Sequence, residues 1–377
     1  MINYGKHSIN DADRIAVDAV LRSDFLTTGP MVEAFESKLE NIVGSPCISV
    51  SSGTAALHSA YAAINLQPGD EVITPPITFI ATQATAAMFG AKIVFVDIFS
   101  ETGLINPNLV EKAITSRTRA IVAVDYAGVP ADIHSLRKIA DKYGVYLIED
   151  AAHSFGSTID GQPVGSIADL TTFSFFPTKN ATTGEGGAVA SIKSDLLKRA
   201  QEFSRQGLVR DPKRFELIND GPWHQEVHHF GLNYRLPDIL CALGINQVQR
   251  ILEFKQKRQA IFDQYTSILG DVRDLILPTK PSNSDVMWHL FAIQVPASLR
   301  KKIFVALREK NIGVQVNYIP AYKHPVFKNS NISLGDFKES ELFYSREISL
   351  PMHVSLSEDE VNYICDSLIS ILRKVNC

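Results

Sequence analysis

The chain between residues 47 and 148 alternates short apolar runs with amphipathic segments, and this alternation restricts its fold more than any other feature. The apolar runs predict strands at residues 47–50, 71–74, 93–96, 120–124 and 145–148. The segments between them predict helices from residue 54, at 79–89, at 107–115 and at 132–143. Strands that alternate with helices indicate a mostly parallel sheet with helices on both faces. In such sheets ligands bind beyond the carboxyl ends of the strands.

A lysine lies in a glycine-rich loop after the next predicted strand. Residues 171–176 (TTFSFF) are β-branched and aromatic, and Pro177 ends this strand because it lacks an N–H for the ladder. Lys179 follows, in a loop that continues to residue 187 with three glycines. A partly desolvated lysine has a lowered pKa, and its neutral amine can form a Schiff base with an aldehyde. The alternative is a solvated surface lysine, which is the default for most of the 37 Lys and Arg residues.

Other strand ends carry groups that complement Lys179. Asp150 ends the strand before it, and Ser174 lies five residues upstream of the lysine. Gly53 and Thr54 stand between a strand and a helix, where backbone N–H groups point at an anion. A pyridoxal phosphate (PLP) site needs an acid at the ring nitrogen, a lysine for the aldehyde and donors for the phosphate. Taken alone, the Gly53 turn would read as a plain helix cap, but beside the other three groups it predicts a PLP site.

Two stretches around these residues resemble a known family. EDAAHSFG (149–156) and VGSIADLTTFSFFPTKNATTGEGGAV (164–189) resemble the DegT/DnrJ/StrS sugar aminotransferases. The resemblance implies an α/β, fold-type-I PLP transferase like aspartate aminotransferase, acting on nucleotide-linked keto-sugars. It also implies a large PLP-binding α/β domain at residues 1–245 with a mostly parallel sheet, a smaller α+β domain at 246–377, and a homodimer with shared active sites.

The resemblance also assigns roles to individual residues. Phe79 would stack on the PLP ring, although a core phenylalanine is the alternative, and His153 would flank the phenolic oxygen of the cofactor. Asn233 would reach across a dimer interface to the PLP phosphate of the other subunit. Nine residues would bind substrate: Tyr4, Asp24, Phe25, Leu26, Thr27, Tyr318, Ile319, Pro320 and Ala321.

Less specific segments, such as SDFLTTGP and GPWHQEVHHFGLNYRL, resemble the PseC branch of the family. That branch aminates C4 of a UDP-linked 4-keto-6-deoxy-N-acetylhexosamine on the way to pseudaminic acid, and the expected amino donor is L-glutamate. Phe176 departs from the branch, which usually has histidine there, and SSGTAAL replaces NSATSAL. Another nucleotide-linked keto-sugar is therefore an alternative substrate.

Three other functions are alternatives for a chain with this pattern. A sugar dehydratase of the same fold has histidine in place of the lysine, so Lys179 disfavours it. A PLP-binding regulatory protein without turnover remains an alternative, although the Asp150–Lys179 pair argues against it. A nucleotide-binding dehydrogenase would need GxGxxG after the first strand, and the chain has SSGT there.

Patterns outside this region predict the remaining elements. Helices are expected at residues 11–21, from 32 to 42, at 194–205, 242–254, 299–310 and 357–374, with Ser357 as the N-cap of the last. Strands are expected at 287–295 and 313–317.

Composition excludes several partners. The net charge of −4 gives no electrostatic footprint for nucleic acid, and no apolar run is long enough to span a membrane. Four scattered cysteines without CxxC spacing indicate neither zinc nor a redox motif, and they suit a reducing cytoplasm. His224 and His228 have the i, i+4 spacing of metal ligands, but no HExxH or nearby cysteine accompanies them, so no metal is expected.

Overall fold

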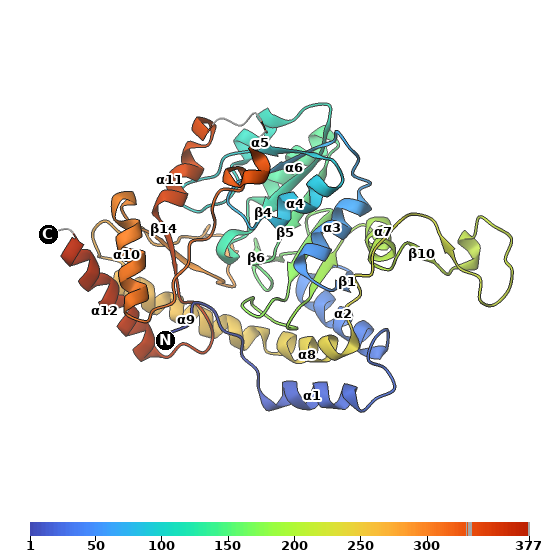
Figure 1. Cartoon of the computed structure of the whole chain (residues 1–377), viewed down its shortest axis with the longest axis horizontal. Coiled ribbons are helices and arrows are strands. Elements are labelled where there is room, and N and C mark those ends of the chain that lie inside the picture. Colours follow the sequence, from blue (N-terminus) through green and yellow to red (C-terminus); the bar gives the residue numbers. More distant parts are fainter. Residues whose placement is uncertain (329, 331–333, 376–377) are drawn as a thin grey trace.

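A seven-stranded sheet forms the centre of the computed structural model, which describes residues 1–328, 330 and 334–375 (Figure 1). Its strand order is β1 (Cys47–Val50), β9 (Gly187–Ala190), β8 (Leu170–Ser174), β5 (Tyr146–Asp150), β4 (Thr118–Val124), β2 (Glu71–Thr74) and β3 (Lys92–Phe95). Neighbouring strands are parallel except around β9, which is antiparallel to both β1 and β8. The described residues 175–186 between β8 and β9 form a loop without a crossover helix, and the chain returns antiparallel. The predicted α/β fold with a mostly parallel sheet is confirmed.

Helices cover both faces of this sheet, because successive strand residues point to opposite sides. Val72 of β2 belongs to a buried cluster with α3 (Gly53–Ala63) and α7 (Ser194–Ser204). Its neighbour Ile73 belongs to a second cluster with α6 (Ile133–Tyr143) on the other face. Three more helices pack around the sheet, namely α2 (Pro30–Val43), α4 (Ala81–Met88) and α5 (Pro107–Ala113).

Two consecutive helices lead from the sheet to the C-terminal part of the chain. The predicted helix at 242–254 is two helices, α8 (Asp238–Gln249) and α9 (Ile251–Leu269), separated at Arg250. N-terminal helix α1 (Asp11–Leu21) packs against α8. The C-terminal part contains β13 (Phe291–Gln294) paired antiparallel with β14 (Glu347–Leu350), and helices α10 (Ala297–Glu309), α11 (Lys338–Arg346) and α12 (Glu358–Val375). The Ser357 side chain caps α12 through the Glu360 N–H at 3.2 Å, as predicted.

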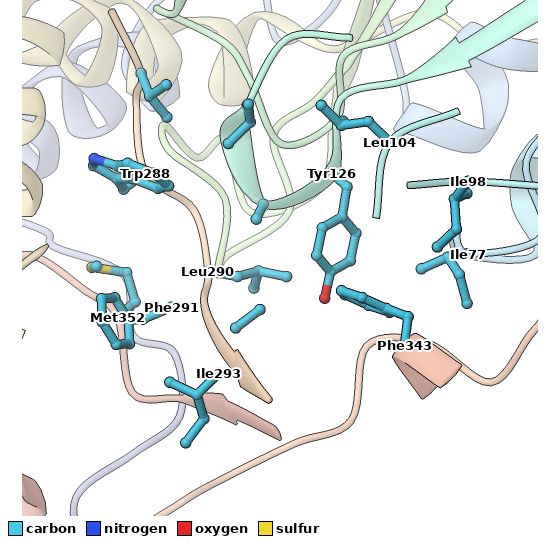
Figure 2. Packing of buried hydrophobic residues seen from close by; sticks show 14 of the residues in the cluster. Ile77, Ile98, Leu104, Tyr126, Trp288, Leu290, Phe291, Ile293, Phe343 and Met352 are labelled. Atoms are coloured by element: carbon cyan, nitrogen blue, oxygen red, sulfur yellow. The ribbon is translucent and has the colours of Figure 1, made fainter. Parts of the chain in front are cut away.

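Aromatic side chains join this C-terminal part to the sheet layer (Figure 2). The rings of Tyr126 and Phe343 lie 5.4 Å apart and meet edge to face, and Trp288 is fully buried against Phe262, with ring centroids 3.8 Å apart. This continuous core holds the segment after α10 close to the carboxyl ends of the central strands.

Two predicted strands differ from the structure. The strand at 287–295 contains only residues 291–294, because the His289 N–H donates to the Ala127 carbonyl and the Met287 N–H donates to Ser157 instead of to a neighbouring strand. The predicted strand at 313–317 is absent, and residue 315 forms a single bridge to residue 349. The backbone of Asn317 bonds to side chains instead: its N–H donates to Glu347 and its carbonyl accepts from Tyr126.

Smaller elements complete the described chain. Short strands are β6 (Thr158–Ile159), β7 (Gln162–Pro163), β10 (Leu208–Val209), β11 (Glu226–Val227) and β12 (Ser284–Asp285), and 3₁₀ turns occur at Tyr126–Gly128, Pro212–Arg214, Ala321–Lys323, Pro325–Phe327 and Leu334–Asp336. Residues 205–235, which we call the arm, connect α7 to α8 and extend away from the body around β10 (Figure 1). Among the described helices, none has the length and apolar character needed to cross a membrane.

Candidate active site

A cavity of about 530 Å³ opens at the carboxyl ends of the central strands, where the fold class predicted a ligand site. Of the predicted residues it is lined by Tyr4, Gly53, Thr54, Phe79, Asp150, His153, Ser174, Lys179 and Tyr318. The structure therefore brings together residues from the N-terminus, four central strands or their loops, and the segment after α10. It also adds residues that the sequence did not single out for the site: Ser52, Leu57, Thr178, Glu185, His289, Gln315 and Asn317.

The first turn of α3 forms a cradle for an anion. The Ser52 hydroxyl accepts a hydrogen bond from the Ala55 N–H at 3.0 Å, which caps the helix and places Gly53 and Thr54 at its start. Ser174, the last residue of β8, packs directly against Gly53. The backbone N–H groups at the helix N-terminus and the hydroxyls of Thr54 and Ser174 are the kind of donors that a phosphate group requires. Glycine is needed at position 53 because a Cβ there would lie 2.8 Å from the Cβ of Ser174.

We therefore expect Gly53→Ala to weaken cofactor binding and to destabilise the fold by about 1–3 kcal/mol, since the added methyl group overpacks the cradle. Urea unfolding and a PLP titration measure the two effects. In the double variant Gly53→Ala/Ser174→Gly the contact is removed, so stability should recover while PLP affinity stays low, because Ser174 is itself a proposed phosphate donor. Equal PLP affinity in Gly53→Ala and the parent protein would contradict the prediction that this cradle binds the phosphate of PLP.

Asp150 ends β5 with its carboxylate at the cavity wall, and only 6% of the residue is exposed. The Thr82 hydroxyl donates to Oδ2 at 2.7 Å and the Ala152 N–H donates to Oδ1 at 3.3 Å. Burial raises the pKa of this carboxyl group, while the two hydrogen bonds and the charge of Lys179 act in the opposite direction. A buried carboxylate with this support fits the protonated ring nitrogen of PLP.

Lys179 lies in the loop between β8 and β9, with its own N–H donating to the Phe176 carbonyl at 2.9 Å. Burial lowers the pKa of its amine to about 8, against the opposing effect of the Asp150 charge. A larger fraction of this amine is therefore neutral near pH 7 than for an ordinary lysine.

The rate at which Lys179 captures PLP should follow this pKa. Below about pH 8 the rate should fall about tenfold per pH unit, and above it the rate should level off, because attack requires the unprotonated amine. Borohydride trapping at each pH measures the rate. Nα-acetyl-lysine, whose ε-amine is free, is assayed in parallel and corrects for ionisation of the PLP aldehyde itself. A corrected midpoint near that of free lysine would show that burial does not activate the amine.

Aromatic side chains form the opposite wall of the cavity. The exposed ring of Phe79 lies 6.1 Å from that of Tyr318, and the Tyr318 hydroxyl is 3.1 Å from Nε2 of His153. His153 in turn packs on His289, with ring centroids 4.3 Å apart. Burial lowers the pKa of both histidines well below the usual range, so both are neutral at pH 7. The Tyr4 hydroxyl accepts from the Asn317 side chain at this wall.

Other predicted site residues lie outside this cavity within the single chain. Asp24, Phe25, Leu26 and Thr27 form an exposed segment between α1 and α2, and Asn233 is exposed at the base of the arm. After Tyr318, Ile319 is 45% exposed, whereas Pro320 and Ala321 are buried, and the Ala321 N–H donates to the Pro76 carbonyl. The roles that the resemblance gave to these residues stay predictions.

The two arm histidines bond to one carboxylate. His224 and His228 approach Glu226 through their Nε2 atoms, at 3.2 and 2.6 Å from its two oxygens. Within residues 1–328, 330 and 334–375, no group of three or more His, Cys, Asp or Glu side chains is placed to hold a metal ion.

The cavity offers what PLP requires: an amine, a buried carboxylate and an anion cradle whose size is set by Gly53. When bound, PLP supplies an electron sink that stabilises negative charge on the carbon attached to the amino nitrogen. The protein would contribute the covalent attachment and the proton transfer through Lys179, charge at the ring nitrogen through Asp150, and orientation through the cradle and the aromatic wall.

Comparison with known proteins agrees with this chemistry. The model of the DegT/DnrJ/EryC1/StrS aminotransferase family matches residues 7–369. An uncharacterised protein of Methanocaldococcus jannaschii is 37% identical, over 98% of this chain and 96% of its own. The UDP-4-amino-4,6-dideoxy-N-acetyl-beta-L-altrosamine transaminase of Campylobacter jejuni is 33% identical, over 100% of this chain and 98% of its own.

Solved structures extend the similarity to the whole fold. The PMP (pyridoxamine phosphate) form of a sugar aminotransferase from Streptococcus pneumoniae superposes with a TM-score of 0.93 at 30% identity, covering 100% of both chains. Helicobacter pylori PseC, an aminotransferase of pseudaminic acid biosynthesis, also has a TM-score of 0.93 at 30% identity, covering 99% of both chains. This chain is thus a sugar aminotransferase with PLP as its cofactor, and it belongs to the DegT/DnrJ/EryC1/StrS aminotransferase family.

Proposed function

We propose that the enzyme transfers an amino group from L-glutamate to C4 of a UDP-linked 4-keto-6-deoxy-N-acetylhexosamine, in a pathway of the pseudaminic acid type. The observation that carries this proposal is the similarity to the Campylobacter transaminase over the whole chain rather than over the PLP motifs alone. The tyrosines of the cavity support it, since the hydroxyl groups of Tyr4 and Tyr318 in the lining suit the oxygen-rich surface of a sugar.

Each cavity residue has a proposed role in this reaction. Lys179 attaches the cofactor and moves the proton between the carbon of the donor and the carbon of the cofactor, because it is the one lysine among the described residues that line the cavity. Asp150 favours the protonated ring nitrogen, and Gly53, Thr54 and Ser174 bind the phosphate. Phe79 covers one face of the ring, and His153 faces its phenolic oxygen. Tyr4 and Tyr318 contact the sugar.

Two half-reactions test this proposal separately. The PLP-loaded enzyme is first mixed with L-glutamate, and formation of 2-oxoglutarate measures acceptance of the donor. The resulting pyridoxamine form is then mixed with the UDP-linked 4-keto-6-deoxy-N-acetylhexosamine, and mass spectrometry together with NMR identifies the aminated carbon. Turnover at C4 supports the proposal, and failure of this sugar after successful reaction with glutamate overturns it.

A second candidate substrate is another nucleotide-linked keto-sugar. The observation in its favour is Phe176, which is 44% exposed in the cavity lining where the PseC branch usually has histidine. Keto-sugars linked to dTDP or GDP, offered to the same pyridoxamine form, distinguish this candidate. A PLP-binding regulatory protein without turnover would react with none of them.

We also propose a homodimer with shared active sites. The arm carries apolar side chains that a single chain leaves exposed, including Trp223 at 73%, Ile218 at 93% and Phe230 at 97%. Exposed apolar groups at this density favour a protein partner. A second hollow of about 590 Å³ lies between α2, α7 and the arm, and its lining includes Thr28 and Arg235, which are close in the sequence to the predicted residues Thr27 and Asn233. A second copy bound here would explain why those two lie outside the Lys179 cavity of their own chain.

Complementation between two inactive variants tests the shared site. If Asn233 acts in the partner's site, a dimer of one Lys179→Ala chain and one Asn233→Ala chain has one site with both residues intact. Mixing the two variants after reversible dissociation should restore about a quarter of the parental activity, since half of random dimers are mixed. No recovery, with mixed dimers present by native mass spectrometry, would place Asn233 in its own chain's site or outside any site.

We infer two further features, a division into domains and a cellular location. We propose the division into domains at residues 1–245 and 246–377, a boundary that falls within α8. A cytoplasmic location is in keeping with Cys47, Cys241 and Cys365, which are buried free thiols.

A further inference from the structure

We propose that Thr82 is a positioning residue that fixes Asp150 relative to the wall carrying Phe79, and so sets the charge and place of the acid that would face the ring nitrogen of the cofactor. The inference rests on the proposed roles of Asp150 and Phe79. Thr82 lies in the first turn of α4, is fully buried and does not line the cavity, so it acts through Asp150.

One hydroxyl group connects the two walls. Oγ1 of Thr82 is 2.7 Å from Oδ2 of Asp150, 2.9 Å from the Thr78 hydroxyl and 3.2 Å from the Phe79 carbonyl. A threonine hydroxyl has one proton to donate and can accept from other donors. The shortest contact is to the carboxylate, which is also the strongest acceptor, so Thr82 donates to Asp150 and accepts from Thr78.

The direction of this donation depends on the charge of Asp150. Against an ionised carboxylate the Thr82 hydroxyl proton stays on Oγ1 and points at Oδ2. A protonated Asp150 would instead donate to Thr82, whose proton would then turn to the Phe79 carbonyl. Because the arrangement with Thr82 donating to an anion is the stronger one, the hydroxyl favours the ionised acid.

Asp150 has little other support for its charge. Its second described donor is the Ala152 N–H at 3.3 Å, which is a long hydrogen bond. The titratable side chains that face it are Lys179, Tyr61, Tyr318 and Asp125, and of these Lys179 alone favours the ionised acid. Burial raises the pKa of the acid, and loss of the Thr82 donor would raise it further.

The backbone of Thr82 is also held in place. The Tyr61 hydroxyl, from α3, donates to the Thr82 carbonyl at 2.8 Å. Since α3 begins at the anion cradle, Thr82 connects the helix of the cradle, the acid and the backbone of the aromatic wall. A change of its hydroxyl alone, with the backbone contact kept, isolates the effect on Asp150.

Thr82→Val removes the hydroxyl and keeps the shape. In the holoenzyme we expect a fall in kcat and in PLP affinity of about ten- to a hundredfold, the range for a lost hydrogen bond to a charged group. Thr82→Ser should restore most of both. Thr85→Val is the matched control, because Thr85 is a buried threonine of the same helix whose hydroxyl donates to the Ala81 carbonyl at 2.7 Å.

The same substitution in the Asp150→Asn background separates positioning from general destabilisation. If Thr82 acts through the charge of the carboxylate, Thr82→Val should lower PLP affinity and kcat several-fold less in that background than in the parent protein, because the hydroxyl then donates only to a neutral amide, whereas independent effects would multiply. Equal losses in both backgrounds, or the same loss for Thr85→Val, would overturn the inference. If Asp150→Asn itself leaves PLP affinity and kcat unchanged, the proposed role of Asp150 fails, and a loss in Thr82→Val would then have a different cause.

Discussion

Lys179→Ala should lower turnover by about 10⁴-fold or more, because the change removes both the nucleophile and the proton-transfer group from the cavity. PLP should still bind through the cradle at Gly53 and through Asp150, so the variant should contain cofactor that denaturation releases without any covalent attachment. In the parent protein, borohydride should fix the cofactor to the peptide that contains Lys179, as measured by mass spectrometry.

Lys142→Ala is the control for this variant. Lys142 is an exposed residue that pairs with Glu111 on the surface, and such pairs contribute little to stability. It should retain full turnover and covalent cofactor. Substantial turnover in Lys179→Ala, after contamination by host aminotransferases has been excluded by a double variant Lys179→Ala/Asp150→Asn, would assign the chemistry to another group.

The centre of the site could be predicted from the sequence because it depends on strand ends. In a parallel sheet the carboxyl ends of the strands meet at one edge, so Asp150, which ends one strand, and Gly53, which follows another, were expected at the same edge. Lys179 joins them because the loop after β8 starts at the same edge. Here local pattern and fold class were sufficient.

Contacts between distant segments could not be predicted in this way. Tyr4 meets Asn317 across more than three hundred residues, and neither position has a periodicity that indicates the pairing. The segment at 313–317 has the alternation of a strand, yet the buried Glu347 carboxylate takes the N–H of Asn317 that a neighbouring strand would otherwise bond. Side chains that replace backbone partners leave no signal in a hydropathy pattern.

The division between α8 and α9 has a similar cause. Neither proline nor glycine marks the break, and the residue there is Arg250. Its guanidinium bonds to Asp13 of α1 at 2.6 Å. The end of α8 is thus anchored by an ion pair to a helix more than two hundred residues earlier, and single-sequence patterns cannot indicate such a contact. Thr82 was missed for the same reason, because its partner Asp150 lies 68 residues away.

Asp150→Asn should lower kcat by about 10³-fold while changing PLP affinity less, because the amide keeps the shape of the acid and loses its charge. The Thr82 hydroxyl can still donate to the amide oxygen, so the backbone around the site should stay in place. Without the negative charge the ring nitrogen no longer favours its protonated form, and the cofactor becomes a weaker electron sink. Stopped-flow measurement of the half-reaction with L-glutamate isolates this step from sugar binding.

The neighbouring acid provides the matched control for that measurement. Glu149 precedes Asp150 in β5, is also buried, and points to the other face of the sheet, where it accepts from the Thr171 hydroxyl at 3.0 Å. Burial raises its pKa to about 7, so Glu149→Gln resembles a form that the protein already populates near neutral pH. This variant should react with L-glutamate at nearly the parental rate. If both substitutions slowed the half-reaction equally, the loss would come from disturbance of β5, and the charge of Asp150 would have no separate role.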